Sequence, residues 1–181
     1  SEYNFTVTNK LYEGTMIVER TALEDEQYGQ IMPRAQSMGE AAAQYIDELV
    51  FTALNDGFST DCYDAQYFFD SDHSEKNSGT QSNLGSSALS GDAVTAAIAE
   101  MRQFKDDQGR YLNIVPDTLI VHPDEEGTAL EIIRSDKYPG SADNRVNVNK
   151  GRVELVVSPF FTSGYWVLAK TKGVIKPAMW Q

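Results

Sequence analysis

The residues of this chain best suited to chemistry are two carboxylates and an imidazole in one short stretch, Asp70, Asp72 and His73. Oxygen and imidazole ligands of this kind can hold a divalent metal ion, which would make the chain a metal-dependent hydrolase. The spacing matches no ligand loop, however, and residues 71–87 are rich in Ser, Asn, Asp and Gly, as exposed loops are. The same residues therefore also fit a polar loop in which Asp70 and Asp72 cap turns. Under that interpretation, alanine at Asp72 or His73 changes stability by no more than about 0.5 kcal/mol.

Two further groups in the sequence are candidates for catalysis. His122 precedes three acids, 124–126, and could form an acid–base cluster, but the end of a strand favours a local hydrogen bond. Cys62 has no base beside it in the sequence and lies among aromatic residues, which is typical of a buried thiol. No glycine-rich phosphate-binding motif is present. The sequence therefore predicts no catalytic residue, no cofactor and no enzyme, but a structural protein.

The elements that would position these groups are clearest around His122. A β-rich run, 118–121, ends before Pro123, which suits the first position of a helix because its missing N–H is no loss there. The three acids that follow suit the positive end of the helix dipole. We expect this helix to turn three residues inward: Ala129, Leu130 and Ile133.

Other elements segregate along the chain. Residues 91–104 predict a helix, and 153–157 and 166–169 predict strands on either side of a turn at 158–164. The inward stripe of the helix consists of Val94, Ala97, Ile98 and Met101. This pattern predicts an α+β fold with two lobes.

The longest predicted helix lies between about Pro33 and Asn55. Ser37 begins a capping box, Pro33 could start the helix earlier, and Gly57 supplies the stop. Upstream of it, residues 3–20 alternate in part and predict a hairpin turned around 9–14.

A shorter helix is expected between the hairpin and the long helix. Thr21 would be its N-cap, and it would run to about Tyr28 and stop at Gly29.

The bulk composition is that of a soluble globular protein, with 181 residues, 41% apolar and 23% charged. The net charge of −12 disfavours tight binding to phosphate backbones. No apolar run approaches the roughly 20 residues of a membrane span, and Cys62, the only cysteine, allows no internal disulfide. Both ends resemble strand edges, so we expect cuts through a longer protein.

Two surface features remain open from the sequence. Phe160, Phe161, Tyr165 and Trp166 form either the edge of the core or an exposed patch that awaits a partner. Lys170, Lys172 and Lys176 form a basic cluster, which could contact nucleic acid or an acidic neighbouring subunit but fits a solvated strand face better.

The order of motifs resembles the major head subunit (gpT) family of Mu-like phages and prophages. The match extends over almost the whole chain, and its order and spacing are more specific than any single piece. The matching segments include Glu13-Gly14-Thr15, Leu23-Glu24-Asp25, Met38 to Ala42, Cys62-Tyr63-Asp64, Phe68-Phe69, Ser82-Asn83-Leu84, Gly109-Arg110, Leu119 to His122, Lys150-Gly151, Val156 to Pro159 and Lys176-Pro177. The chain departs from the family pattern at Ala65, usually Gly, and at Ser74, usually Pro.

The resemblance implies the Hong Kong 97-like capsid fold of tailed phages. Residues 1–20 would be a remnant of the extended loop, 21–84 the peripheral domain with its spine helix, 85–170 the axial domain, and 171–181 the return to the peripheral domain. The N-terminal arm and C-terminal tail would be absent.

The function that it implies is a structural shell subunit. Copies would meet as pentamers and hexamers around enclosed DNA without sequence-specific contacts, in the virion and, during assembly, in the host cytoplasm. A scaffold or a maturation protease could take part. The self-association candidates are Tyr12, Glu13, Phe160, Phe161 and Tyr165. An encapsulin-like compartment shell is the alternative within the same fold.

Overall fold

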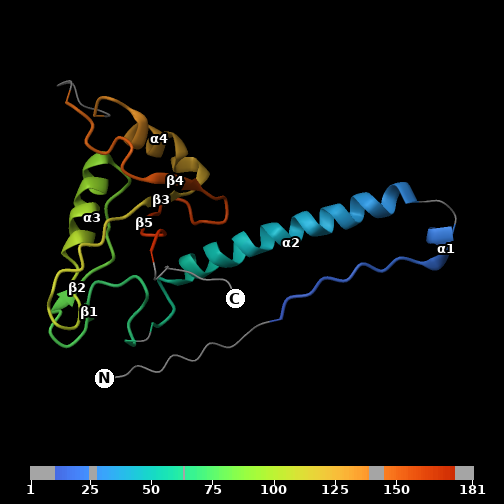
Figure 1. The fold of residues 1–181 in the computed structure, drawn as a ribbon, viewed down its shortest axis with the longest axis horizontal. Coiled ribbons are helices and arrows are strands. Elements are labelled where there is room, and N and C mark those ends of the chain that lie inside the picture. Colours follow the sequence, from blue (N-terminus) through green and yellow to red (C-terminus); the bar gives the residue numbers. More distant parts are fainter. Residues whose placement is uncertain (1–10, 25–27, 63, 139–144, 174–181) are drawn as a thin grey trace. The chain divides into compact units, whose positions relative to one another are not determined.

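The chain combines helices with small sheets (Figure 1). The structure, a computed structural model, describes residues 11–24, 28–62, 64–138 and 145–173. Two compact units divide the chain, residues 1–50 and residues 51–181.

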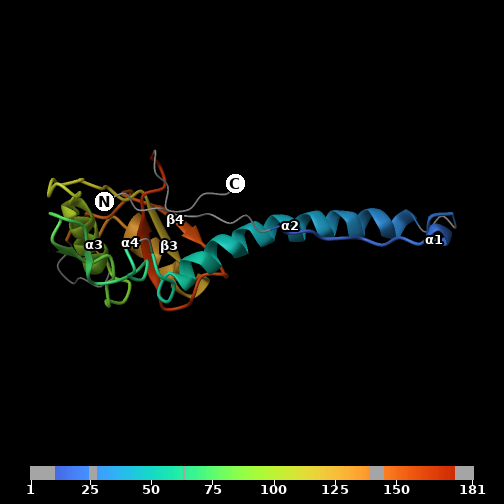
Figure 2. The same ribbon diagram turned by 90° about the horizontal axis from the view of Figure 1, so that it is seen from below.

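The first unit contains an extended run and most of a long helix. Residues 11–19 include no strand and run beside α2 (Tyr28–Asp56) in both Figure 1 and Figure 2. The rings of Tyr12 and Tyr45 meet edge to face, with 5.3 Å between centroids. The predicted hairpin is therefore wrong in its described half, because this run lies along a helix and pairs with no strand. Residues 3–10 lie outside the described residues, as does the expected strand at 177–181.

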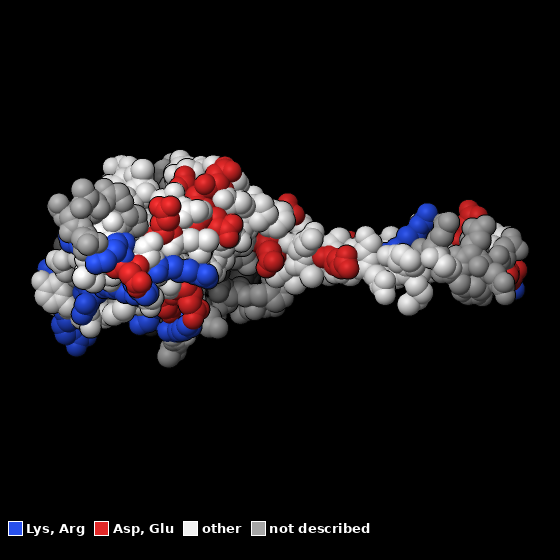
Figure 3. Space-filling model, turned by 90° about the horizontal axis from the view of Figure 1, so that it is seen from above, with Lys and Arg blue, Asp and Glu red and all other residues white. Residues whose placement is uncertain are grey.

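None of the described side chains in residues 11–50 is buried. The largest exposed fractions among its apolar side chains are 86% for Leu11, 87% for Ile17 and 63% for Met32. In Figure 3, most of the side chains visible over α2 are uncharged. An amphipathic helix is normally stabilised by tertiary packing of its apolar face. This unit supplies little such packing from its own described residues.

The predicted long helix is confirmed and is longer than expected. Ser37 and Pro33 lie inside α2, and so does Gly29, which was expected to end the shorter helix. That shorter helix is a single turn, α1 (Arg20–Glu24), with Thr21 inside it and not at its N-cap. A helix can continue through such signals because Ser or Gly costs only about 1 kcal/mol or less relative to Ala. The stop is as predicted, since α2 ends at Asp56 and the Gly57 N–H donates to the Leu54 carbonyl over 3.2 Å.

A three-stranded sheet lies at the centre of the second unit. β3 (Thr118–Val121) pairs in parallel with β4 (Glu154–Val157) and antiparallel with β5 (Trp166–Ala169). A parallel pair needs a crossover connection, and α4 (Glu126–Arg134) lies on it between β3 and β4. All three strands were predicted from the sequence.

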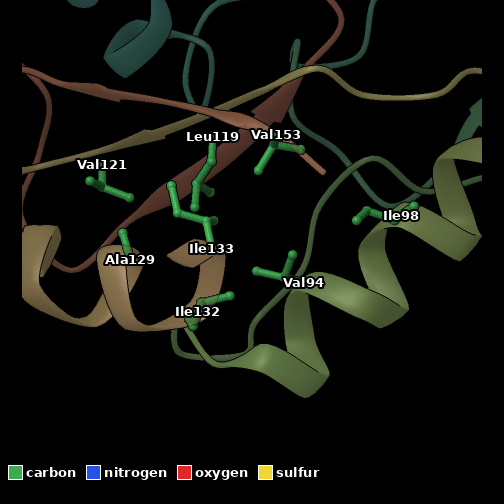
Figure 4. Packing of buried hydrophobic residues seen from close by; sticks show 8 residues of the cluster. All are labelled: Val94, Ile98, Leu119, Val121, Ala129, Ile132, Ile133 and Val153. Atoms are coloured by element: carbon green, nitrogen blue, oxygen red, sulfur yellow. The ribbon is translucent and has the colours of Figure 1, made fainter. Parts of the chain in front are cut away.

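The two faces of β3 face different clusters. Leu119 and Val121 belong to a core shared with α4 and α3 (Gly91–Gln103), shown in Figure 4. Ile120 points to the opposite face, where Phe161 and Ala169 complete a second cluster. Phe51 and Leu54, from the last turns of α2, pack against that second cluster. The sheet is therefore covered on both faces, which explains why every residue of β3 is buried.

The helices of this unit follow the predicted pattern with some differences. Ser90 caps α3 by accepting the Ala93 N–H over 3.2 Å, and Val94 and Ile98 are buried as expected, whereas Ala97 and Met101 of the predicted stripe are half-buried. The helix after β3 begins as a separate 3₁₀ turn, η1 (Pro123–Glu125), before α4. In α4 the buried residues are Ala129, Ile132 and Ile133, whereas Leu130, predicted to point inward, is half-buried.

The stretch predicted as a loop at 71–87 contains a small hairpin. β1 (His73–Ser74) pairs antiparallel with β2 (Thr80–Gln81). The carboxamide of Gln81 both accepts the Lys105 N–H and donates to the Lys105 carbonyl, at 2.6 and 3.1 Å. The hairpin is thus tied to the turn that follows α3.

Candidate functional site

The structure does not bring Asp70, Asp72 and His73 together into a ligand set. The nearest partner of the His73 ring is Asp64, whose Oδ2 lies 2.7 Å from Nδ1. Asp70 Oδ1 instead accepts the Ser71 N–H over 2.6 Å, and Asp72 Oδ2 lies 3.5 Å from Gln66 Nε2. Within the described part of the chain, no three His, Cys, Asp or Glu side chains are placed to hold a metal.

The His73–Asp64 pair is half-buried, with 23% of the imidazole and 8% of the carboxylate side chain exposed. Burial alone would lower the pKa of His73, but the hydrogen bond and charge of Asp64 outweigh it, and the pKa is raised. Burial alone would raise the pKa of Asp64, but the hydrogen bond to His73 outweighs this effect, and the pKa of Asp64 is lowered. The pair therefore joins the turn at 62–66 to the start of β1, and the expectation that His73 is a freely exposed loop residue is wrong.

This pair lines a hollow of about 450 Å³, together with Cys62, Phe68 and Leu112. Cys62 is half-buried, and its backbone N–H donates to the Gln66 carbonyl over 2.6 Å. The carboxylates on the rim take part in local contacts, such as Asp106 with the Arg110 guanidinium at 2.8 Å. The side chains that line the hollow are therefore engaged in local contacts that stabilise the surrounding loops, and they are not arranged as a reaction centre.

His122 makes the local hydrogen bond that was predicted for it. Its Nδ1 accepts the Asp124 N–H over 3.2 Å and so caps η1, while Asp124 Oδ2 lies 3.0 Å from the same nitrogen. Asp124 Oδ2 also accepts the Ser163 hydroxyl over 2.8 Å. These contacts fix the corner after β3 and leave no arranged nucleophile–base pair.

The self-association candidates have unequal exposure. Tyr12, Phe160 and Tyr165 expose 44%, 37% and 48% of their surface, and Glu13 is also exposed. Phe161 is only 2% exposed, because it fills the cluster beneath β3 and β5. Phe161 is therefore a core residue and cannot belong to a contact surface. The sequence left open whether these aromatic residues form a core edge or an exposed patch, and the structure shows both. Phe161 is buried and Trp166 packs against the core, whereas Phe160 and Tyr165 are exposed.

Sequence reasoning missed two buried amides, Asn147 and Asn149, which are 5% and 1% exposed. The Asn147 side chain donates to the carbonyls of Ile132 and Ser135 over 2.7 and 2.9 Å, and so closes the end of α4. The alternation Val-Asn-Val-Asn over 146–149 was the available signal, since period-two alternation indicates an extended segment with one inward face. It was overlooked because the inward residues are polar.

Solved structures with this arrangement of elements are phage capsid chains. The fold matches that of the bacteriophage JBD30 capsid with a TM-score of 0.70 and 24% sequence identity, over 85% of this chain and 75% of that one. A JBD30 capsid decorated with minor capsid protein trimers matches with a TM-score of 0.69, also at 24% identity, over 86% and 75%. The JBD30 procapsid matches with a TM-score of 0.67 at the same identity, over 85% and 76%. The fold is thus that of a phage capsid protein.

The chain belongs to the family described as Mu-like prophage major head subunit gpT, whose profile matches residues 1–90 and 83–161. It is 44% identical over 71 residues to the Mu-like prophage FluMu major head subunit of Haemophilus influenzae. It is also 44% identical over 71 residues to the major capsid protein of Escherichia phage Mu. Each alignment covers 39% of this chain and 23% of the relative. These relatives are structural head proteins and give no support to an encapsulin shell or a hydrolase.

Proposed function

We propose that this protein is a major head subunit, which assembles with copies of itself into an icosahedral shell around the genome of a Mu-like phage or prophage. The observation that carries the proposal is the family match, which extends over residues 1–161. The likeness of the fold to a JBD30 capsid chain supports it.

We assign the fold to the Hong Kong 97-like class and keep the domain plan of the sequence analysis as part of the proposal. Residues 1–20 belong to the extended loop, 21–84 to the peripheral domain with α2 as its spine, 85–170 to the axial domain, and 171–181 to the peripheral domain again. The continuous sheet of β3, β4 and β5, with α3 and α4 on one face, supports a compact axial domain.

The physical support lies in the first unit. Its described side chains include no buried residue, yet apolar side chains are exposed along both the extended run and α2. An exposed apolar surface of this extent marks a site of interaction with another molecule. In a shell, neighbouring subunits cover such surfaces.

Other partners follow from the same role. Subunits meet as pentamers and hexamers, and a scaffold or a maturation protease acts during assembly in the host cytoplasm. The enclosed DNA needs no sequence-specific contact, which agrees with a net charge of −12. No helix in the described part of the chain is both long enough and apolar enough to cross a membrane.

Electron microscopy tests the proposal. The protein, with any residues that precede or follow this chain in its gene, is expressed alone and with its neighbouring head genes, and shells or rings of subunits are expected. Two variants at exposed positions form a matched pair, Ile17→Glu on the extended run and Thr80→Glu on the small hairpin. Both proteins should fold, and only Ile17→Glu should lose assembly. Folded protein that forms neither rings nor shells under either condition would contradict the proposal, and shells filled with a protein cargo would favour the encapsulin alternative.

A further inference from the structure

We propose that the surface at the C-terminal end of α4, formed by Val146, Val148, Arg134 and Arg152, docks head to tail on the acidic turn at 124–126 of a second copy. The inference rests on the proposed function, since it names the surfaces by which copies meet. It commits to one partner, another copy of this chain.

The first observation is a pair of outward valines on a fixed segment. Val146 and Val148 are 70% and 55% exposed, whereas Asn147 and Asn149, which alternate with them, are nearly completely buried. Outward β-branched side chains contribute nothing to the core of their own subunit. Since Val side chains have few rotamers to lose, their burial by a partner carries a small entropic cost.

The buried amides hold this segment in place. Asn149 Nδ2 donates to the Gly91 carbonyl over 2.8 Å and lies 3.0 Å from the Thr95 hydroxyl. Asn147 Nδ2 binds the end of α4, and the Asn147 N–H donates to the Asp136 carbonyl over 3.1 Å. The segment is thus attached to both α3 and α4 before any partner arrives, which preorganises the surface for binding.

The second observation is charge asymmetry. Residues 134–152 contain five Lys or Arg against two Asp, a net charge of +3, so the rest of the chain carries −15. In Figure 3, most Lys and Arg side chains visible on the second unit lie toward one end, with some Asp and Glu among them, and Asp and Glu predominate over the adjoining part. Lys150 pairs with Asp136 and Arg145 with Asp92, whereas no ion pair links Arg134 or Arg152 to a described residue.

The Arg134 and Arg152 backbones are neighbours, because the Gly151 N–H donates to the Ile133 carbonyl over 2.9 Å. Both side chains are exposed. This basic surface therefore carries two exposed arginines that form no ion pair with a described residue, together with two exposed valines.

The complementary charge lies at the other end of the same helix. Asp124 and Glu126 are exposed, Glu125 is half-buried, and no ion pair links Glu125 or Glu126 to a described residue. The two ends of α4, a helix of 9 residues, are separated by about 14 Å along its axis, so they cannot meet within one subunit. A contact between different surfaces of identical copies is heterologous, and it closes into a ring when the rotation permits.

The helix dipole alone would also favour acids at the start of α4 and bases at its end. It gives no reason, however, for two exposed valines on the basic surface. Nucleic acid is the other conceivable partner of a basic surface, but the −15 charge of the remaining chain opposes it.

Sedimentation velocity over a concentration series tests the proposal on the full chain. We expect the reversals Arg134→Glu with Arg152→Glu, and Glu125→Lys with Glu126→Lys, each to weaken self-association at least tenfold. A mixture of the two double variants should restore association, because the two intact surfaces complement each other and the two reversed surfaces are again opposite in charge. Combining all four reversals in one chain should restore association.

Controls separate this contact from general charge effects and from unfolding. Lys170→Glu and Glu100→Lys reverse exposed charges on other elements and should leave association unchanged. Val146→Thr with Val148→Thr should weaken association at least tenfold without changing the thermal unfolding midpoint, because both side chains are mostly exposed. Retained association in these valine and arginine variants overturns the proposal, as does the absence of concentration-dependent association in the unaltered chain.

Two further outcomes keep the inference distinct from the proposed function. If the complete subunit forms shells and each of the two double reversals leaves those shells intact, this contact is wrong and the function stands. Binding of a duplex DNA probe that is lost only in Arg134→Glu with Arg152→Glu, together with unchanged self-association, would assign the surface to nucleic acid.

Discussion

The carboxylate of Asp117 accepts the backbone N–H of Thr171 over 2.8 Å, and this bond ties the residue before β3 to the segment that leaves β5. The same carboxylate accepts the Lys172 N–H and the hydroxyls of Thr118 and Thr171, at 2.8, 2.7 and 2.8 Å. Burial alone would raise the pKa of Asp117, but the backbone and hydroxyl donors outweigh it and hold the pKa well below its usual range. The place where the chain leaves the sheet is thus fixed by one ionised side chain.

We predict that Asp117→Asn destabilises the protein by about 1–3 kcal/mol at pH 7, because an amide NH₂ in place of Oδ2 would face the Lys172 N–H, which can only donate. A carboxylate with a lowered folded-state pKa stabilises the fold above its unfolded pKa of about 4, and the effect is lost as the pH falls through the folded-state pKa. The difference between the two proteins in urea denaturation should therefore shrink below about pH 4. A difference that stays constant from pH 7 to pH 3 would contradict this account.

The adjacent residues Phe160 and Phe161 provide a matched pair for the second cluster. Phe161→Ala should cost about 3–5 kcal/mol, because it leaves a cavity beneath β3. Phe160→Ala should cost far less, because Phe160 is 37% exposed. Chemical denaturation of both variants measures the difference, and equal losses would show that the two side chains share the core.

His73 and Asp72 should respond differently to alanine. We expect Asp72→Ala to change stability by no more than about 0.5 kcal/mol and His73→Ala to cost about 1–3 kcal/mol at pH 6, since it removes the partner of Asp64. A histidine with a raised pKa stabilises the fold below its unfolded pKa of about 6.5, and the effect is lost as the pH rises through the folded-state value. The cost of His73→Ala should therefore be smaller at pH 9. A stoichiometric metal in the purified protein that either variant loses would revive the hydrolase hypothesis.

The strands and the end of the long helix could be predicted because their signals are local. The run 118–121 is β-rich and stops at Pro123, and Gly57 ends α2, so each boundary depends on neighbouring residues. The start of α2 was misplaced because Pro33 and Ser37 are signals of about 1 kcal/mol to a few kcal/mol, which a long helix can overcome.

The contacts that define the candidate sites could not be predicted, because they join residues that are distant in the sequence. Asp117 binds Thr171, and Asn149 binds Gly91, through side chains whose partners only the fold selects. Likewise, the sequence could not decide between Phe160 and Phe161, since the choice depends on which of two adjacent residues in a turn faces β3.

Asn149 offers a test of the hydrogen bonds that hold residues 146–149 against α3. Asn149→Asp keeps the size of the side chain but turns the donor of the bond to the Gly91 carbonyl into a second acceptor. We expect a loss of about 1–3 kcal/mol or more at pH 7, since a buried carboxylate would face a carbonyl oxygen. Hydrogen exchange should show weaker protection in the first turn of α3 than in the unaltered chain. Equal protection in the two proteins would argue that the Asn149 side chain does not hold this turn in place.

The last prediction concerns the oligomeric state of the 181-residue chain. Stable interfaces bury on the order of 1,200–2,000 Å², and the chain spans 75% of the length of the JBD30 capsid chain that it matches. We therefore expect a monomer or a weak small oligomer in dilute solution, and not a closed shell. The net charge of −12 makes copies repel one another over distances that salt screens, with a Debye length of about 10 Å at 0.1 M. Because charge pairs in direct contact are screened less than this long-range repulsion, association should rise between about 0.01 M and 0.15 M salt. Light scattering across this range measures it, and shell-sized particles at the lowest salt would show that this chain alone is sufficient for assembly.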